Sequence, residues 1–245
     1  MVSNDAREYD YCPSASPYVY TDALKPNERT ILKTRCKRWD CPYCASVNKQ
    51  LHRLKVYHGL KKLEDAGHEF DFVTWTSSGK LRDTVSCYKV FQKAWPKLST
   101  RYRREATKIS GLSPQYVFIP ELHKNGRLHW HGVFTGHVST RWWKDNCVES
   151  GFGYMAKSVE LENVSQGANY CLKYISKHIG QTIDIKRFRR INYSRGFPSN
   201  VPDRTDGAWV VLDKTQSIES LVESAWREDK DVTLNGKIIE EIIEE

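Results

Sequence analysis

The segment from Glu121 to His131 contains two histidines separated by one residue, an arrangement that can bind a metal ion. On a β-strand, residues two apart point to the same face. We therefore expect His129 and His131 to project together and Trp130 to project to the other side. The alternative is a strand that carries two incidental surface histidines.

The hairpin that precedes these histidines decides whether a third ligand joins them. The sequence Lys124-Asn125-Gly126 fits a three-residue loop, a type I turn followed by a left-handed glycine. That register places Glu121 opposite His129, and cross-strand partners share a face. A two-residue Asn-Gly loop would turn Glu121 to the far face. With the longer loop, Glu121, His129 and His131 form an open site for Mg²⁺ or, favoured by the imidazoles, Mn²⁺, acting as a Lewis acid on a phosphate.

Residues 164–179 predict a helix whose two tyrosines lie off its apolar stripe. Tyr170 and Tyr174 are four residues apart and are therefore neighbours on one face, with Lys173 and Lys177 beside them. A tyrosine hydroxyl has a pKa of about 10 and needs a nearby cation to become a nucleophile toward phosphate. Lys173 could position the phosphate or stabilise the developing charge. The alternative is that both tyrosines are core residues.

A cysteine cluster near the N-terminus predicts a structural zinc site. Cys36, Cys41 and Cys44 lie in one short segment with the spacing of a zinc knuckle. The fourth ligand is open among Cys12, the first choice, His52 and His58. The alternative is a set of buried free thiols. The remaining cysteines, Cys87, Cys147 and Cys171, lie in apolar patterns and are expected in the core.

The charge of the 245-residue chain is unevenly distributed. The net charge is +8, but residues 1–200 carry 33 basic and 18 acidic residues, whereas residues 201–245 carry five and twelve. A basic body rich in aromatic residues favours single-stranded nucleic acid as a partner, because bases stack on aromatic rings. A merely soluble basic surface is the alternative. We expect DNA contacts from Lys177, Arg187, Arg189 and Arg190.

Composition excludes other classes of protein. Hydrophobic residues make up 39% of the chain, which is too many for a disordered protein. No stretch approaches the ~20 apolar residues of a membrane-spanning helix. The first residues lack the basic and apolar regions of a signal peptide, so we expect a cytoplasmic protein without a membrane partner.

Hydrophobic periodicity predicts an alternation of strands and helices. Residues 1–44, with several prolines, are expected to be irregular. The order β-α-β-β-α-β-α over residues 69–179 predicts an α+β fold with an antiparallel sheet and flanking helices, close to the ferredoxin-like plan. Predicted helices cover 45–66, 83–108 (interrupted at Pro96), 140–148, 164–179 and 217–227. Predicted strands cover 69–77, 115–122, 128–134, 154–161 and 209–214, and the basic stretch 185–197 is strand-like.

Three motifs occur in the order found in the HUH endonuclease superfamily, and the chain resembles its rolling-circle replication initiators from phages and plasmids. Phe72-Val-Thr-Trp-Thr76 resembles motif I, His129-Trp-His131 motif II, and Tyr170-Cys-Leu-Lys173-Tyr174 motif III. The run that begins at Glu121 is similar to motif II of single-stranded DNA virus initiators, where the glutamate is the third metal ligand. The two tyrosines are similar to those of the gene A proteins of small isometric phages. Relaxases of the superfamily place the tyrosine before the histidines.

The resemblance implies a fold and domain plan: an N-terminal zinc-knuckle segment and helix (1–66), an HUH nicking domain (67–200) and a small acidic C-terminal unit (201–245). It also implies metal-dependent nicking of single-stranded origin DNA. Tyr170 would attack, leaving a 5′-phosphotyrosine and a 3′-OH primer, and Tyr174 would then act in strand transfer. In some members one tyrosine performs both steps. No helicase domain fits in this length, so a host helicase and replication machinery are implied partners, in the host cytoplasm if the protein is viral.

Three other functions are compatible with parts of this pattern. The first is a two-tyrosine rolling-circle transposase. The second is a non-catalytic DNA-binding regulator that contains zinc, which needs the cysteines and the basic body alone. The third is a metal-dependent hydrolase that uses water in place of tyrosine and forms no covalent adduct.

Overall fold

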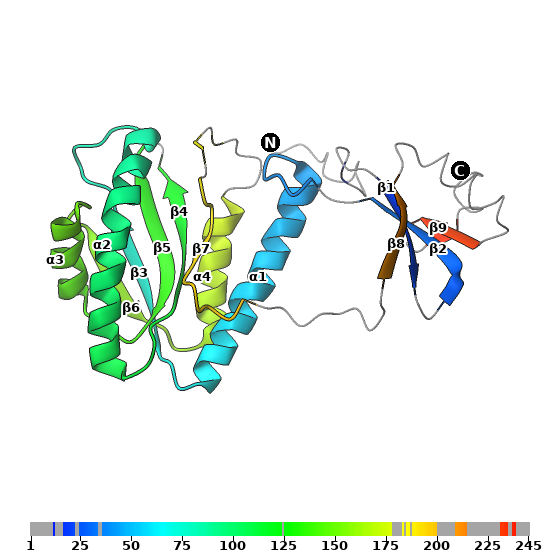
Figure 1. Ribbon diagram of the computed structural model, residues 1–245. Helices are drawn as coiled ribbons and strands as arrows, with labels where there is room; N and C mark the ends of the chain where they lie inside the picture. Colours follow the sequence, from blue (N-terminus) through cyan, green and yellow to red (C-terminus); the bar gives the residue numbers. More distant parts are fainter. Residues whose placement is uncertain are drawn as a thin grey trace. The chain divides into compact units, whose positions relative to one another are not determined.

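The computed structural model describes residue 12 and residues 17–22, 25–33, 36–123, 125–177, 183, 185–186, 188–199, 209–214, 231–234 and 237–238. The chain divides into two compact units. One comprises Met1–Val47 and Pro202–Glu245, and the other comprises Asn48–Val201 (Figure 1). Whether residues 1–66 and 201–245 fold as separate domains stays a prediction.

The first unit contains a sheet made from both ends of the chain. Its strand order is β10-β9-β2-β1-β8, in which β2 and β9 are parallel and the other pairs are antiparallel. The strands are β1 (Pro17–Asp22), β2 (Lys25–Lys33), β8 (Trp209–Lys214), β9 (Asp231–Leu234) and β10 (Lys237–Ile238). The strand predicted at 209–214 is confirmed. The helix predicted at 217–227 lies outside the described residues.

The expectation that residues 1–44 are irregular is wrong for β1 and β2. Pro17 is the first residue of β1 and Pro26 is the second residue of β2, close to a shift in the β1–β2 register. At such positions a proline removes little from the hydrogen-bonded ladder. The residues between the prolines include Tyr18-Val-Tyr-Thr21, which have high strand propensity. The prolines therefore mark strand ends and do not break the strands.

The second unit is built around a five-stranded antiparallel sheet with the order β6-β3-β5-β4-β7. Its strands are β3 (Phe70–Thr76), β4 (Tyr116–Leu122), β5 (Leu128–Thr135), β6 (Ala156–Glu160) and β7 (Asn192–Tyr193). Its helices are α1 (Pro42–Asp65, which begins in the first unit), α2 (Thr84–Ser110), α3 (Thr140–Ser150) and α4 (Val164–Ser176). The order β3-α2-β4-β5-α3-β6-α4 confirms the predicted α+β fold. Of the described residues in the stretch 185–197, those of β7 alone form a strand.

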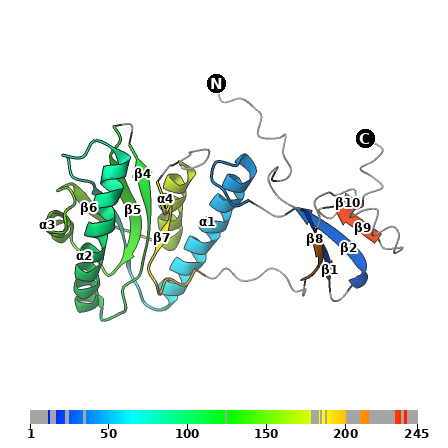
Figure 2. The same cartoon turned by 45° about the horizontal axis from the view of Figure 1, so that its top comes forward.

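The helices cover the two faces of this sheet in pairs. Figures 1 and 2 show α2 and α3 on one face and α4, with α1 beside it, on the other. Trp130 lies on the α2 face, where its ring stacks on Trp75 of β3 and Phe91 of α2. The residue between the two histidines is thus buried in the main core, and the histidines face α4. None of the helices in the described part of the chain is long and apolar enough to cross a membrane.

Helix α2 does not break at Pro96, where an interruption was expected. The helix runs from Thr84 to Ser110, and the hydroxyls of Ser99 and Thr100 donate to the Pro96 carbonyl. Asp83 caps its N-terminus by accepting from the Ser86 N–H at 2.8 Å. Packing of the apolar face of α2 on the sheet compensates for the proline.

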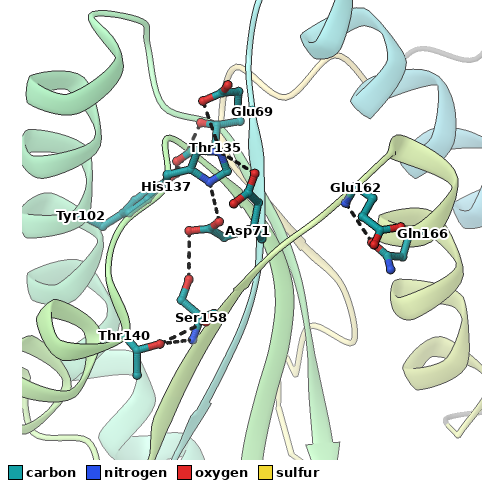
Figure 3. A network of polar contacts seen from close by, with 10 residues as sticks. Glu69, Asp71, Tyr102, Thr135, His137, Thr140, Ser158, Glu162 and Gln166 are labelled. Carbon is teal, nitrogen blue, oxygen red and sulfur yellow. Dashed lines mark hydrogen bonds and ion pairs between the residues drawn. The ribbon is translucent and has the colours of Figure 1, made fainter.

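A polar network stabilises the end of the sheet where β5 leads into α3 (Figure 3). His137 has a φ of 34°, in the left-handed region, and its Nδ1 lies 2.7 Å from the Asp71 carboxylate. Its Nε2 lies 3.2 Å from Glu69 and 3.8 Å from Glu160. Asp71 also accepts a hydrogen bond from the Ser158 hydroxyl at 3.0 Å. Partial burial lowers the pKa of His137, but its contact with Asp71 and the neighbouring carboxylates outweigh burial and raise the pKa.

This network predicts a pH-dependent stability. Because the pKa of His137 in the folded protein lies above its ordinary 6.5, the imidazolium stabilises the fold fully below pH 6.5. That contribution disappears as the pH rises through the folded-state pKa. Urea unfolding over a pH series should show that the stability difference between wild type and His137→Gln shrinks with rising pH, and that Asp71→Asn weakens this dependence. Parallel pH profiles for wild type and His137→Gln would contradict it.

Candidate active site

The hairpin between β4 and β5 adopts the register predicted for the three-residue loop. Glu121 pairs with His129, and the His123 N–H donates to the Arg127 carbonyl at 3.0 Å. Gly126 has a φ of 78°, the left-handed conformation that the loop requires, and its N–H donates to the His123 carbonyl at 2.9 Å. Lys124 lies outside the described residues. Glu121 consequently shares a sheet face with His129 and His131.

A glycine immediately after His131 permits close packing of these strands. A Cβ at Gly132 would lie 2.4 Å from the Val117 carbonyl oxygen and 2.4 Å from the Phe118 Cβ. These atoms belong to β4 and can move little without disturbing its pairing with β5. Gly132 thus helps to keep β4 in the register that places Glu121 beside the histidines.

Glu121 and His131 are in direct contact. The His131 Nε2 lies 2.6 Å from a Glu121 oxygen, and both side chains are about nine-tenths buried, with exposures of 8% and 11%. Burial lowers the pKa of His131 to about 4 despite the neighbouring carboxylate, so the imidazole is neutral at neutral pH. The contact is then an N–H···O hydrogen bond from a neutral ring. If a metal replaced that hydrogen, His131 and Glu121 would both be available as ligands.

Thr74 orients His131, a role that the motif comparison did not identify. Its hydroxyl lies 3.0 Å from the His131 Nδ1, and the two residues are directly opposite each other on β3 and β5. The strand alternation around Thr74 could have placed it on this face. A hydrogen bond to Nδ1 fixes the ring and leaves Nε2 directed at Glu121, as is usual for metal-binding histidines.

His129 presents a ring nitrogen that has no hydrogen-bond partner among the described residues. This atom, Nε2, is buried, and the ring stacks on His123 with centroids 3.8 Å apart. Burial lowers the pKa of His129 to about 4, so this imidazole is also neutral at neutral pH. A buried, unpaired nitrogen next to a carboxylate fits a metal-ligand role.

The three predicted ligands do not yet converge on one point. Among the described residues, the one group of three or more potential ligands whose donor atoms all lie within 4.8 Å of one another is the cysteine cluster. The structure brings His131 to Glu121 and leaves His129 beside them. The donor set fits Mn²⁺ or Mg²⁺, and its metal binding stays a prediction.

Lys177, expected to bind DNA, contacts the Glu121 carboxylate instead. Its ammonium forms an ion pair with the Glu121 oxygen that does not face His131. Burial raises the pKa of Glu121, but the contacts with Lys177 and His131 outweigh burial and lower it. A DNA-binding role for Lys177 stays a prediction. Of the other predicted DNA contacts, Arg189 is exposed, Arg190 is half-buried and Arg187 lies outside the described residues.

The two tyrosines of α4 face the sheet at different places. The Tyr174 ring stacks on the His131 imidazole, with centroids 3.8 Å apart and planes 6° from parallel. The Tyr170 ring stacks on Phe72 of β3, with centroids 4.6 Å apart. The predicted separation of the tyrosines from the apolar stripe is confirmed, since Val164, Ala168, Cys171 and Ile175 are buried.

The surroundings of the two tyrosines also differ. Tyr174 is half-buried, and burial together with the charge of Glu121 raises its pKa. Lys177 lies 5.1 Å and Lys173 5.9 Å from the centre of its ring. Tyr170 is 38% exposed. Tyr174 is therefore the tyrosine closer to the predicted metal ligands and to both lysines.

The four N-terminal cysteines form a cluster that can bind a metal such as zinc. The sulfur atoms of Cys12, Cys36, Cys41 and Cys44 all lie within 4.8 Å of one another. Burial raises the pKa of the Cys44 thiol to about 12 and also raises that of Cys41, so a bound cation is needed to hold these groups as thiolates. Cys12, the first choice for the fourth ligand, joins the cluster, whereas the His52 Nδ1 lies 2.9 Å from the Tyr193 hydroxyl.

Removing two of these ligands should release the metal. We expect the purified wild type to contain about one equivalent of zinc, and Cys41→Ser with Cys44→Ser to contain none and to melt at a lower temperature. Elemental analysis and thermal melting measure the two effects. Cys147→Ala is a matched control, because Cys147 is buried in the other unit and its loss should leave the zinc content unchanged. A metal-free wild type with an unchanged melting curve in the double variant would exclude the site.

The comparison with known families covers the segment that contains this face of the sheet. Residues 71–179 match the model of the ORF2 family of replication-associated proteins. The match confirms the resemblance to rolling-circle replication initiators and indicates a role in the initiation of replication. The replication-associated segment begins in β3 and extends just past α4, so it contains the predicted metal ligands and both tyrosines. No curated protein and no solved structure matches the chain.

Proposed function

We propose that this protein initiates rolling-circle replication by nicking single-stranded origin DNA through attack of a tyrosine on the scissile phosphate. The observation that carries the proposal is the stack of Tyr174 on His131, whose imidazole also contacts Glu121. A potential nucleophile, a neutral imidazole and a buried carboxylate are thereby in contact within the replication-associated segment. A non-catalytic DNA-binding protein has no need of this arrangement.

Glu121, His129 and His131 would hold the catalytic Mg²⁺ or Mn²⁺. When bound, the metal polarises the scissile phosphate and stabilises the charge that develops on it. Thr74 keeps the His131 ring in place through its Nδ1. Lys177 leaves Glu121 when the metal binds and is then free to pair with a DNA phosphate. Zinc in the cysteine cluster would have a structural role.

Tyr174 makes the first attack in this proposal. Its hydroxyl oxygen forms a bond to phosphorus, the bond from phosphorus to the 3′ oxygen breaks, and the proton lost from the hydroxyl is balanced by one gained by the 3′ oxygen. The products are a 5′-phosphotyrosine and a 3′-OH that primes synthesis. Tyr170, whose ring contacts Phe72, then attacks the regenerated origin, and the released 3′-OH displaces Tyr174 to close the circle. This order reverses the order expected from the family resemblance.

A denaturing gel tests the proposal directly. The protein is incubated with Mn²⁺ and a pool of labelled single-stranded oligonucleotides that span the candidate origin. We expect a labelled band that survives boiling in detergent and is absent when EDTA is added before the DNA. Binding of the origin strand without such a band favours the DNA-binding regulator. Cleavage without the band favours a hydrolase that uses water.

A further inference from the structure

An open pocket of about 420 Å³ lies beside Tyr170, between β3, β6 and α4. Phe72 and Tyr170 contribute stacked aromatic rings to its wall, and Val159 contributes an apolar side chain. Tyr170 is 38% and Val159 46% exposed, which is high for large apolar side chains. Lys157, Glu160 and Gln166 add a cation, a carboxylate and an amide.

This combination fits a nucleobase. A base has a flat face that stacks on aromatic rings and an edge that carries hydrogen-bond donors and acceptors. Lys157 offers donors and Glu160 acceptors, and the Gln166 amide is held by accepting from the Glu162 N–H at 3.0 Å (Figure 3). A free phosphate would gain nothing from the aromatic and apolar walls, and Glu160 would repel it. The pocket chemistry therefore favours a base over an anion.

The pocket is continuous with the candidate active site. Thr74 lines the pocket, and its hydroxyl also contacts the His131 Nδ1. Tyr170 lies one helical turn before Tyr174, which stacks on His131. A DNA strand with its scissile phosphate at His131 would place an adjacent nucleotide near this pocket.

We infer that the pocket binds one nucleobase of the single DNA strand, next to the scissile phosphate. This inference rests on the proposed nicking function for its ligand and deepens it. Stacking on Tyr170 and Phe72 supplies the affinity, and Lys157, Glu160 and Gln166 bind the edge of the base. The bound base fixes the position of the strand relative to Tyr174.

Oligonucleotide binding can isolate the contribution of the base. Fluorescence anisotropy, without added divalent metal, compares a labelled oligothymidylate of about six nucleotides with the same sugar–phosphate backbone lacking bases. The ratio of the two dissociation constants measures base-dependent binding. In Val159→Glu the ratio should fall by about 5- to 100-fold, the range for loss of one stacked base. Lys157→Ala should lower it less. Repulsion of the backbone by the new carboxylate affects both probes and cancels in the ratio.

A matched variant and a separate readout make the outcomes decisive. Val148→Glu, on α3, replaces a valine that is 49% exposed, and it should keep the wild-type ratio. Equal ratios in wild type, Val159→Glu and Lys157→Ala overturn the base pocket. The denaturing gel tests nicking independently, so a covalent band with unchanged ratios removes only the pocket. Changed ratios without a covalent band leave a base-binding pocket in a protein that does not nick.

Discussion

Tyr174→Phe should lower the rate of nicking by at least about 10³-fold, because it removes the attacking oxygen. Phenylalanine keeps the ring that stacks on His131, so the packing of α4 on the sheet is preserved. The DNA affinity should therefore change little. Single-turnover nicking in Mn²⁺, followed on a denaturing gel, measures the rate, and anisotropy measures the binding.

Tyr170→Phe is the matched control for the order of attack. It also retains the ring, which stacks on Phe72, but it removes the hydroxyl that we assign to the second attack. We expect nicking to persist and strand transfer to fail. If Tyr170→Phe abolishes the covalent band and Tyr174→Phe does not, the proposed order is wrong. If the variant with both substitutions still cleaves DNA, tyrosine chemistry is refuted.

The local parts of the site could be predicted because each depends on neighbouring residues. The Asn125-Gly126 turn and the alternation of the strands determine that Glu121 pairs with His129. The period of the helix determines that Tyr170 and Tyr174 lie off the buried stripe. Both features need only a few residues of sequence context, and the structure confirms both.

The parts that were missed depend on residues far apart in the chain. The ion pair of Lys177 with Glu121 exists because α4 packs across β4 and β5, which no local pattern encodes. The same packing places Tyr174, and not Tyr170, on His131. Strands β1 and β2 pair with β8 and β9 from the other end of the chain, so their short β-forming runs carried little local signal against the prolines.

His131→Ala should lower Mn²⁺-dependent nicking by on the order of 10²-fold or more, because stabilisation of the phosphate charge by the metal is worth several kcal/mol. His129→Ala should have a similar effect, and Glu121→Gln should weaken metal binding by removing the ligand charge. Calorimetric titration with Mn²⁺ measures metal affinity separately from the nicking rate. The fold should survive, as judged by thermal melting, because these side chains lie on the face opposite the main aromatic core.

His123→Ala is the comparison that tests the ligand set. His123 is exposed and stacks on His129, but it lies on the loop side of Glu121 and is not one of the predicted ligands. Its loss should affect Mn²⁺ affinity much less than the loss of His129. Equal losses of affinity would mean that a third imidazole binds the metal and that the predicted set of Glu121, His129 and His131 is incomplete. Normal, EDTA-sensitive cleavage by His131→Ala would show that the metal lies elsewhere, and the role of Glu121 would then be its ion pair with Lys177, which ties α4 to the sheet.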